Sequence, residues 1–130
     1  MTETIAVYGT LRSGFGNNYL LQQAEAERIG GGITEAGFDM TDCGFPFAIP
    51  GGEDRIRAEV WSVPKDTIYM IDSLEGYPGW YDKQAVTVTL DDGSYIIANI
   101  YTMGEEEAGG TPVIPVDGVL DWAADKRKYG

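Results

Sequence analysis

The sequence contains no histidine and a single cysteine, Cys43, among its 130 residues. Without histidine, a Ser-His-Asp triad, a Cys-His dyad and a histidine-ligated metal centre are all excluded. One cysteine permits no internal disulfide, which indicates a reducing and therefore cytoplasmic setting. No basic residue neighbours Cys43 in the sequence to favour a reactive thiolate. We therefore expect Cys43 to be a small buried hydrophobic residue.

Basic residues and long apolar runs are also scarce. Nine Lys and Arg stand against 21 Asp and Glu, for a formal charge of −12. A field of that sign repels phosphate backbones and anionic lipids, so neither nucleic acid nor a membrane surface is an expected partner. A solvated, solubilising surface accounts for the excess charge, and a DNA mimic or a protein adapted to high salt are the alternatives. The chain lacks an apolar run of about 18 residues and a basic, apolar N-terminal leader.

The remaining composition supports one domain over residues 1–130. Hydrophobic residues make up 43% of the chain and aromatic residues 12%, enough for one core. Apolar periodicity and turn residues predict strands over 5–8, 33–40 and 58–63, helices over 17–29, 66–75 and 119–128, and a hairpin of 85–90 with 94–101. Residues 42–54 and 103–111 are expected as loops, and the apolar run 45–50 should pack on the core or line a pocket. This irregular order predicts an α+β fold with a mixed sheet or small barrel.

The first segment that can carry chemistry is Val7-Tyr8-Gly9-Thr10-Leu11-Arg12, a strand that breaks into a glycine turn. Gly9 can simply permit a tight turn. Alternatively, the N–H groups of Gly9, Thr10 and Leu11 converge on a carboxylate or a developing oxyanion. Arg12 either adds a cation beside them or is an ordinary surface residue.

The second segment is Asp72 to Tyr81, which places Glu75 at the end of a predicted helix. A free glutamate has a pKa of about 4.3, too low for a base that must accept a proton from an ammonium group. Burial against Leu74, Tyr77, Trp80 or Tyr81 would raise that pKa and permit acid–base catalysis at neutral pH. The alternative is that Glu75 caps a turn or pairs with Lys83 on the surface.

Other clusters carry weaker signals. Gly14-Phe15-Gly16 completes no phosphate-loop pattern. The acidic groups at 91–92 and 105–107 lack the ligand spacing of a dedicated calcium loop, so solvated turns explain them better.

Taken together, the motifs resemble those of the γ-glutamylcyclotransferase-like family. The family's opening Tyr-Gly-Ser/Thr-Leu, followed by a basic residue, a Gly and an Asn, stands here as residues 8–12, with Gly14 or Gly16 and Asn17 or Asn18 following. Residues 45–49 are similar to its aromatic-Pro pocket loop, 59–61 to its Gly-Glu-Val-Tyr strand, 72–81 to its catalytic helix, and 117–122 to its Gly-Asp-Trp stretch. The resemblance runs from Ile5 to about Trp122. Lys83 stands where family members commonly have Arg, which forms the stronger carboxylate pair.

The resemblance implies a small mixed β-barrel flanked by short helices, with a pocket at one end. It implies an enzyme that releases 5-oxoproline from a small γ-glutamyl amide without a cofactor or a metal, through attack of the substrate's own α-amine. By the same resemblance, Glu75 is the catalytic residue, and the substrate contacts are Tyr8, Gly9, Thr10, Leu11, Arg12, Pro46 and Tyr81. The alternative is a non-catalytic protein on the same fold that binds a small anion or blocks a basic partner. An exposed Glu75, with its pocket filled by Phe47 or Trp80, would favour that alternative.

Overall fold

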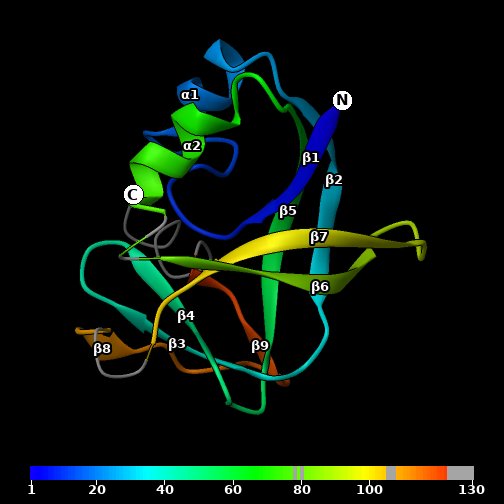
Figure 1. The fold of residues 1–130 in the computed structure, drawn as a ribbon. Coiled ribbons are helices and arrows are strands. Elements are labelled where there is room, and N and C mark those ends of the chain that lie inside the picture. The colour runs from blue at the N-terminus through cyan, green and yellow to red at the C-terminus, as the bar shows by residue number, and fades with distance from the viewer. Residues whose placement is uncertain (78, 80, 105–107, 123–130) are drawn as a thin grey trace.

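The computed structural model describes residues 1–77, 79, 81–104 and 108–122 (Figure 1). Two short helices and nine strands follow one another along these residues. They are β1 Thr2–Val7, α1 Asn18–Gln23, β2 Glu27–Thr34, β3 Phe38–Asp42, β4 Pro46–Pro50, β5 Arg55–Pro64, α2 Ile68–Glu75, β6 Asp82–Leu90, β7 Tyr95–Thr102, β8 Thr111–Pro112 and β9 Val119–Leu120. The predicted strand at the N-terminus, the helix ending at Glu75 and the hairpin are confirmed.

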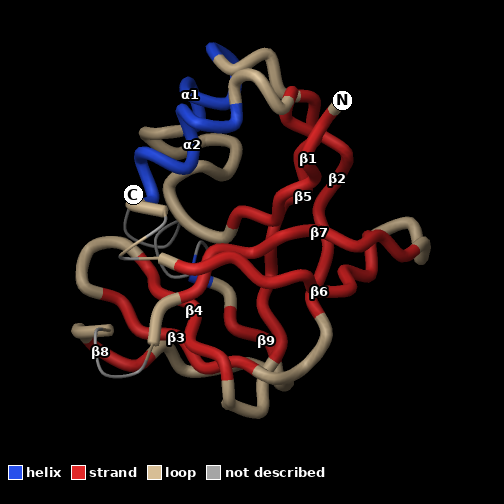
Figure 2. Tube along the Cα trace, viewed as in Figure 1, coloured by secondary structure: helices blue, strands red, loops and turns tan. Residues whose placement is uncertain are grey.

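Five of these strands close into a small barrel. Strands β1, β7, β6, β2 and β5 pair in that order, and a further β5–β1 pairing completes the ring. The β1–β7 pair is parallel and the other pairs in the ring are antiparallel, so the barrel is mixed, as predicted. Strand β9 adds to β5, and a second sheet of β4, β3 and β8 lies beside the barrel (Figure 2).

Small side chains make this narrow barrel possible. Alternate residues of a strand point to one face, and the inward set includes Ala6 of β1, Ala58 and Val60 of β5, and Ala98 and Ile100 of β7. All five are buried at 0–2% exposure. A barrel of so few strands has a narrow interior, because its diameter grows with strand number, and the two alanines beside Val60 and Ile100 leave room for these larger side chains.

The opposite face of β1 and β5 forms a second core with the helices. Val7 and Trp61 point outward and pack in one cluster with Leu21 of α1 and Ile71 of α2. The two helices lie together at one end of the molecule (Figure 1). Within the described ranges, neither helix has the length and apolar character needed to cross a membrane.

The predicted helix over 17–29 is only partly correct, because α1 ends at Gln23 and β2 begins at Glu27. Gly30, Gly31 and Gly32, which follow the predicted helix, lie inside β2. A Cβ at Gly32 would meet the Thr89 carbonyl oxygen at 2.6 Å, so the glycine permits close approach of β6. The predicted strand over 33–40 is divided by a turn at Gly37, whose φ is +134°.

Three other expectations are wrong or fall partly outside the described residues. The apolar segment predicted as a loop is strand β4, paired with β3 along its length, and residues 46–49 are buried. Cys43, expected to be buried, is exposed in the turn between these strands. The expected final helix begins as strand β9, because residues 119 and 120 pair with β5. Residues 123–128 of that helix and 105–107 of the acidic loop lie outside the described residues.

Candidate active site

A cavity of about 300 Å³ lies between the turn after β1, the start of β4 and the last turn of α2. Its lining includes seven of the eight residues predicted as site residues, which are Tyr8, Gly9, Thr10, Leu11, Pro46, Glu75 and Tyr81. The structure adds Ala6, Val7, Asn17, Gly44, Phe45, Leu74 and Tyr101. Segments separated by more than 60 positions in the sequence therefore meet in one hollow.

Glu75 is the one acidic side chain in the lining. It is the last residue of α2, which ends at Gly76 in the left-handed conformation with φ +73°, an ordinary helix stop for glycine. Burial raises the pKa of Glu75 from 4.5 to about 7, because the ionised form loses hydration. Leu74 and Tyr81, two of its predicted neighbours, line the same cavity. Trp80 lies outside the described residues.

Lys83, the alternative partner of Glu75, is engaged elsewhere. Its Nζ lies 2.6 Å from Asp72 Oδ1 and 2.8 Å from Glu3 Oε2. One ammonium thus bridges two carboxylates, whereas the sequence suggested only a weak single contact. Phe47, which could have filled the pocket, packs against Phe45 and Tyr81 instead.

The turn after β1, residues 8–12, is held by its carbonyl groups, and we call it the cradle turn. The Gly9 carbonyl accepts from Arg12 N at 3.1 Å, and the Thr10 carbonyl accepts from Asn17 N at 3.0 Å. In a planar trans peptide the next N–H points the opposite way. The N–H groups of Thr10 and Leu11 are therefore directed away from the loop that follows.

Gly9 is required by close packing. A Cβ at this position would lie 2.9 Å from both Cγ and Cδ of Pro46, which is closer than such atoms approach in proteins. Pro46 belongs to β4, so the cradle turn and the second sheet meet at Gly9. The glycine of the motif thus serves a close approach as well as a turn.

Arg12 is the predicted site residue that the structure does not place in the cavity lining. It is buried, and its Nη1 lies 3.1 Å from Asp121 Oδ1, close to the C-terminal end of the described chain. The neighbouring Ser13 is anchored by Glu59, whose Oε1 accepts from Ser13 N at 2.8 Å and from Ser13 Oγ at 3.1 Å. Buried Glu59 on β5 therefore holds the chain just beyond the cradle turn.

Three buried tyrosines form the polar part of the cavity wall. Tyr8 Oη donates to the Tyr101 carbonyl at 2.8 Å and accepts from Ala48 N at 3.1 Å. Tyr101 Oη donates to Asp72 Oδ1 at 2.7 Å, and Tyr81 Oη makes a longer contact of 3.4 Å with the Pro46 carbonyl. Burial raises the pKa of all three phenols, so they are neutral at pH 7. No sequence motif contains Tyr101, so its place in the cavity wall could not be predicted from the sequence.

No cluster suited to a metal ion occurs among the described residues. Of the two acidic groups considered from the sequence, Asp91 forms an ion pair with Arg57 at 2.7 Å, and Asp92 accepts from Ser94 within its own turn. The group at 105–107 lies outside the described residues. The cavity wall combines one carboxyl group of pKa about 7 with the glycine turn of residues 8–11, a set suited to proton transfer beside a bound anion.

Comparison with known proteins gives a consistent result. The family described as "Gamma-glutamyl cyclotransferase, AIG2-like" matches residues 5–122. A Methanocaldococcus jannaschii protein named as a candidate gamma-glutamylcyclotransferase is 35% identical over 102 residues, covering 76% of this chain and 82% of its own. A Drosophila melanogaster protein named in the same way is 32% identical over 109 residues, covering 78% and 69%. The crystal structure of a Mus musculus AIG2-like protein superposes with a TM-score of 0.71 at 25% identity, covering 78% and 77%.

Proposed function

Because the chain belongs to the AIG2-like gamma-glutamyl cyclotransferase family, we propose that it cleaves a γ-glutamyl amide with Glu75 as its catalytic residue. Membership of this family identifies the protein as an enzyme of the cyclotransferase type. The reaction releases 5-oxoproline and an amine. The observation that carries the proposal is the position of Glu75, a carboxyl group with a pKa of about 7 in the wall of a cavity of about 300 Å³.

The reaction needs a base that later becomes an acid. Glu75 removes a proton from the substrate's α-ammonium, and the resulting amine attacks the δ-carbonyl carbon. A new C–N bond closes the five-membered ring, and the ring nitrogen then gives up a second proton. The original amide C–N bond breaks, and the departing nitrogen receives both protons through Glu75, which leaves an ammonium product and an ionised Glu75. A carboxyl group with a pKa near 7 can do both at neutral pH, because neither its protonated nor its ionised form dominates.

The rest of the site holds the substrate in a reactive shape. A cavity of about 300 Å³ is at the small end of ligand pockets, which suits a glutamyl group. The N–H groups of Thr10 and Leu11 supply donors for the glutamyl oxygens, and the rings of Tyr8 and Tyr81 enclose the carbon chain. Folding this flexible chain so that its amine faces its own carbonyl removes much of the entropic barrier.

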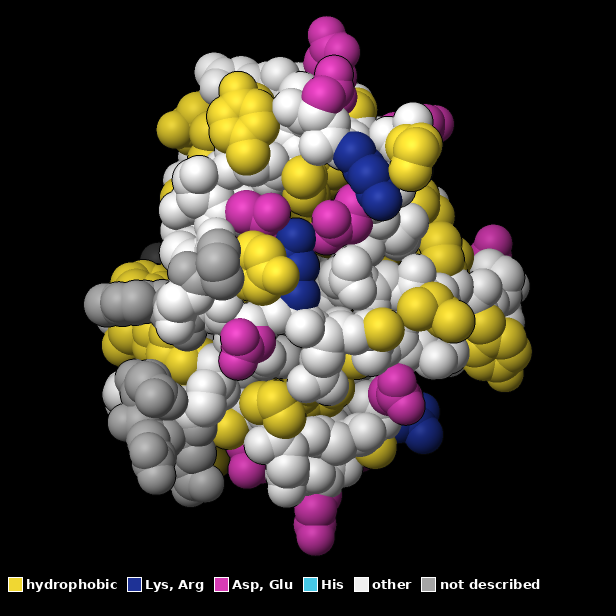
Figure 3. Space-filling view, viewed as in Figure 1, with side chains coloured by type: hydrophobic (Ala, Val, Ile, Leu, Met, Phe, Trp, Pro, Cys, Tyr) yellow, Lys and Arg dark blue, Asp and Glu magenta, His cyan; other side chains and the backbone are white. Residues whose placement is uncertain are grey.

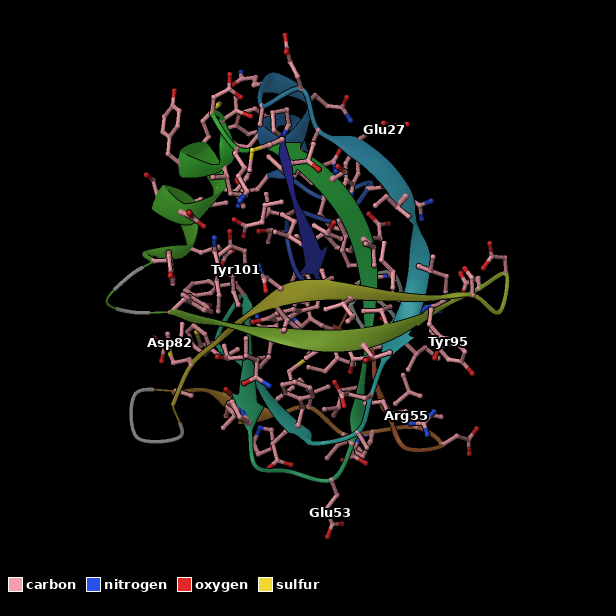
Figure 4. The ribbon with its side chains drawn as sticks, turned by 45° about the vertical axis from the view of Figure 1, so that its right-hand side comes forward. Glu27, Glu53, Arg55, Asp82, Tyr95 and Tyr101 are labelled. Carbon is pink, nitrogen blue, oxygen red and sulfur yellow. The ribbon has the colours of Figure 1, made fainter. Side chains whose placement is uncertain are left out.

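The test is Glu75→Gln, which preserves the shape of the side chain and removes its capacity to accept a proton. Wild-type and variant proteins are incubated with a panel of γ-glutamyl amides, and 5-oxoproline is detected directly. The expected result is product from the wild type, with turnover by the variant reduced at least about a thousandfold. A matched control is Glu53→Gln, an exposed residue at the far end of the molecule from Tyr101 (Figure 4).

The same panel identifies the leaving amine. It should include an α-amino acid, a lysine side-chain amine and a small metabolite amine as leaving groups. A Glu75→Gln protein that keeps most of its activity would contradict the assigned role of Glu75. A folded wild-type protein that makes no product from any member of the panel would contradict the proposed reaction.

A further inference from the structure

Helix α2 carries Glu75, but few interactions within the helix itself fix the helix in place. It is eight residues long, lacks a side-chain hydrogen bond at its N-cap, and Ile71 is its one fully buried side chain. Tyr69 and Leu74 are exposed. An isolated helix of this length is unstable in water, so contacts with the barrel must hold it.

Besides the apolar contacts of Ile71, the polar contacts to the barrel converge on one carboxylate oxygen. Asp72 Oδ1 receives Lys83 Nζ of β6 at 2.6 Å and the hydroxyl of Tyr101 of β7 at 2.7 Å. Lys83 Nζ also contacts Glu3 Oε2 of β1 at 2.8 Å. We call these four residues, Glu3, Asp72, Lys83 and Tyr101, the anchor cluster. It links α2 to three strands of the barrel, and Figure 3 shows a basic side chain between acidic ones on this face.

The anchor cluster is well shielded from water. The side chains of Lys83, Asp72 and Glu3 are 11%, 18% and 18% exposed, and Tyr101 is 2% exposed. Ion pairs with so little exposure are far less screened than surface pairs. Without the ammonium group, two carboxylates on α2 and β1 would face each other unneutralised. Their repulsion and their demand for water would separate the helix from the barrel.

Asp72 stands three residues before Glu75, which is about one helical turn. A fixed Asp72 therefore fixes the rotation and depth of the last turn of α2. Tyr101 belongs both to the anchor cluster and to the cavity wall, so the cluster adjoins the site directly. Figure 4 shows Tyr101 between β7 and α2.

We propose that Lys83 is a positioning residue for Glu75, holding the last turn of α2 against the barrel so that the carboxyl group stays in the cavity wall. The inference rests on the proposed function for its catalytic consequence. Its structural consequence, the burial of Glu75, is independent of turnover.

The measurement is the titration of Glu75 followed by carbon NMR of its side-chain carboxyl, assigned with Glu75→Gln. The groups facing Glu75 from other elements are Tyr8, Tyr81 and Tyr101, which stay neutral across this range because burial raises each pKa. The titration therefore reports on hydration of Glu75. In Lys83→Met we expect its pKa to fall from about 7 toward 4.5 as water reaches it.

The direction in which the pKa of Glu75 changes distinguishes a positioning role of Lys83 from a direct charge effect. A direct charge effect would raise the pKa of Glu75 when the cation is lost, which would overturn the positioning role. An unchanged pKa would overturn it as well. In parallel, kcat should fall at least about tenfold with a smaller change in KM, because the general base is displaced while the cradle turn remains. Lys83→Arg should restore both values.

Two further variants keep the test decisive. Tyr101→Phe removes the hydrogen bond to Asp72 without changing any charge, so it should move the pKa of Glu75 in the same direction as Lys83→Met only through displacement of α2. It serves if Lys83→Met does not fold. Arg57→Met removes an exposed ion pair with Asp91 on the barrel surface and should change neither value. An inactive wild type with the expected titrations would overturn the proposed reaction and leave the role of Lys83 supported.

Discussion

The two walls of the cavity are held by different kinds of contact. In the cradle turn, Asn17 Nδ2 donates to Thr10 Oγ1 and Asn18 Nδ2 donates to the Leu11 carbonyl, both at 2.8 Å and both seven positions apart. In the wall formed by α2, Tyr101 reaches Asp72 across 29 positions, and Lys83 reaches Glu3 across 80. The backbone of the cradle turn is thus shaped by neighbours in the chain, with distant residues holding its two ends through Tyr8 and Arg12, whereas α2 is joined to the barrel by polar contacts to β1, β6 and β7.

This difference explains which of the supporting contacts could be recognised in the sequence. Local hydrogen bonds require particular residues at fixed spacing, so the cradle turn and the two asparagines that follow it appear as one motif from Tyr8 to Asn18. The anchor cluster requires only complementary charges that the fold happens to bring together, and such charges follow no spacing rule. The comparison also predicts different responses to mutation.

Gly9→Ala should disrupt the cradle turn. The added methyl group would lie 2.9 Å from two ring atoms of Pro46, so the turn or β4 must move. We expect a loss of kcat/KM of at least about 100-fold and a destabilisation of about 1–3 kcal/mol. Steady-state kinetics and denaturant unfolding measure the two effects. Gly16→Ala is the control, since a Cβ there meets nothing within 4 Å and should be tolerated.

The raised pKa of Glu75 in the α2 wall should determine the pH dependence of the reaction. Glu75 must be ionised to accept a proton, and its pKa is about 7. As pH falls below that value the carboxyl group becomes protonated, so kcat/KM should drop about tenfold per pH unit. A pH–rate profile between pH 5 and 9 measures it. An acid limb near pH 4.5 would show that Glu75 is not the base or is not buried in solution.

Ionised Glu75 should also lower the free energy of unfolding at alkaline pH. Its pKa is raised in the folded state from 4.5 to about 7, so folding favours the protonated form. The associated stability is present below pH 4.5 and is lost as pH rises through 7. Discounted for partial exposure, Glu75→Gln should be about 1–2 kcal/mol more stable than wild type at pH 8.

The same Glu75→Gln difference should vanish near pH 4. Denaturant unfolding at the two pH values checks this expectation. An equal difference at both would mean that the gain comes from packing of the amide and not from the carboxyl group's ionisation.

Asn17→Ala should have the smallest effect. It removes one hydrogen bond to Thr10 and leaves the backbone bond between the same residues in place. We expect a destabilisation of about 0.5–1.5 kcal/mol and a rise in KM of a few fold, with kcat nearly unchanged. Steady-state kinetics with the best substrate of the panel tests this split. A large fall in kcat would mean that the cradle turn also positions the reacting atoms.

Much of the fold was readable from local pattern, and the exceptions share one cause. The helix over 68–75 and the hairpin of β6 and β7 follow from apolar spacing and turn residues. The glycines of β2, the buried strand β4 and the exposed Cys43 did not follow, because each depends on a strand pairing that the local pattern did not show, of β2 with β6 in the first case and of β4 with β3 in the other two. A Gly or Pro in such a position indicates a turn locally but serves close packing in the folded protein.

The sequence by itself excluded histidine chemistry, set the charge at −12, and defined the cradle turn and the helix that ends at Glu75. Through its resemblance to a family it also indicated seven residues that line the cavity. Only the tertiary structure showed that Arg12 pairs with Asp121, that Tyr101 forms part of the wall, and that Lys83 bridges two carboxylates. It alone determined the raised pKa of Glu75, because that pKa depends on the exclusion of water, and water is excluded only where segments distant in the chain pack together.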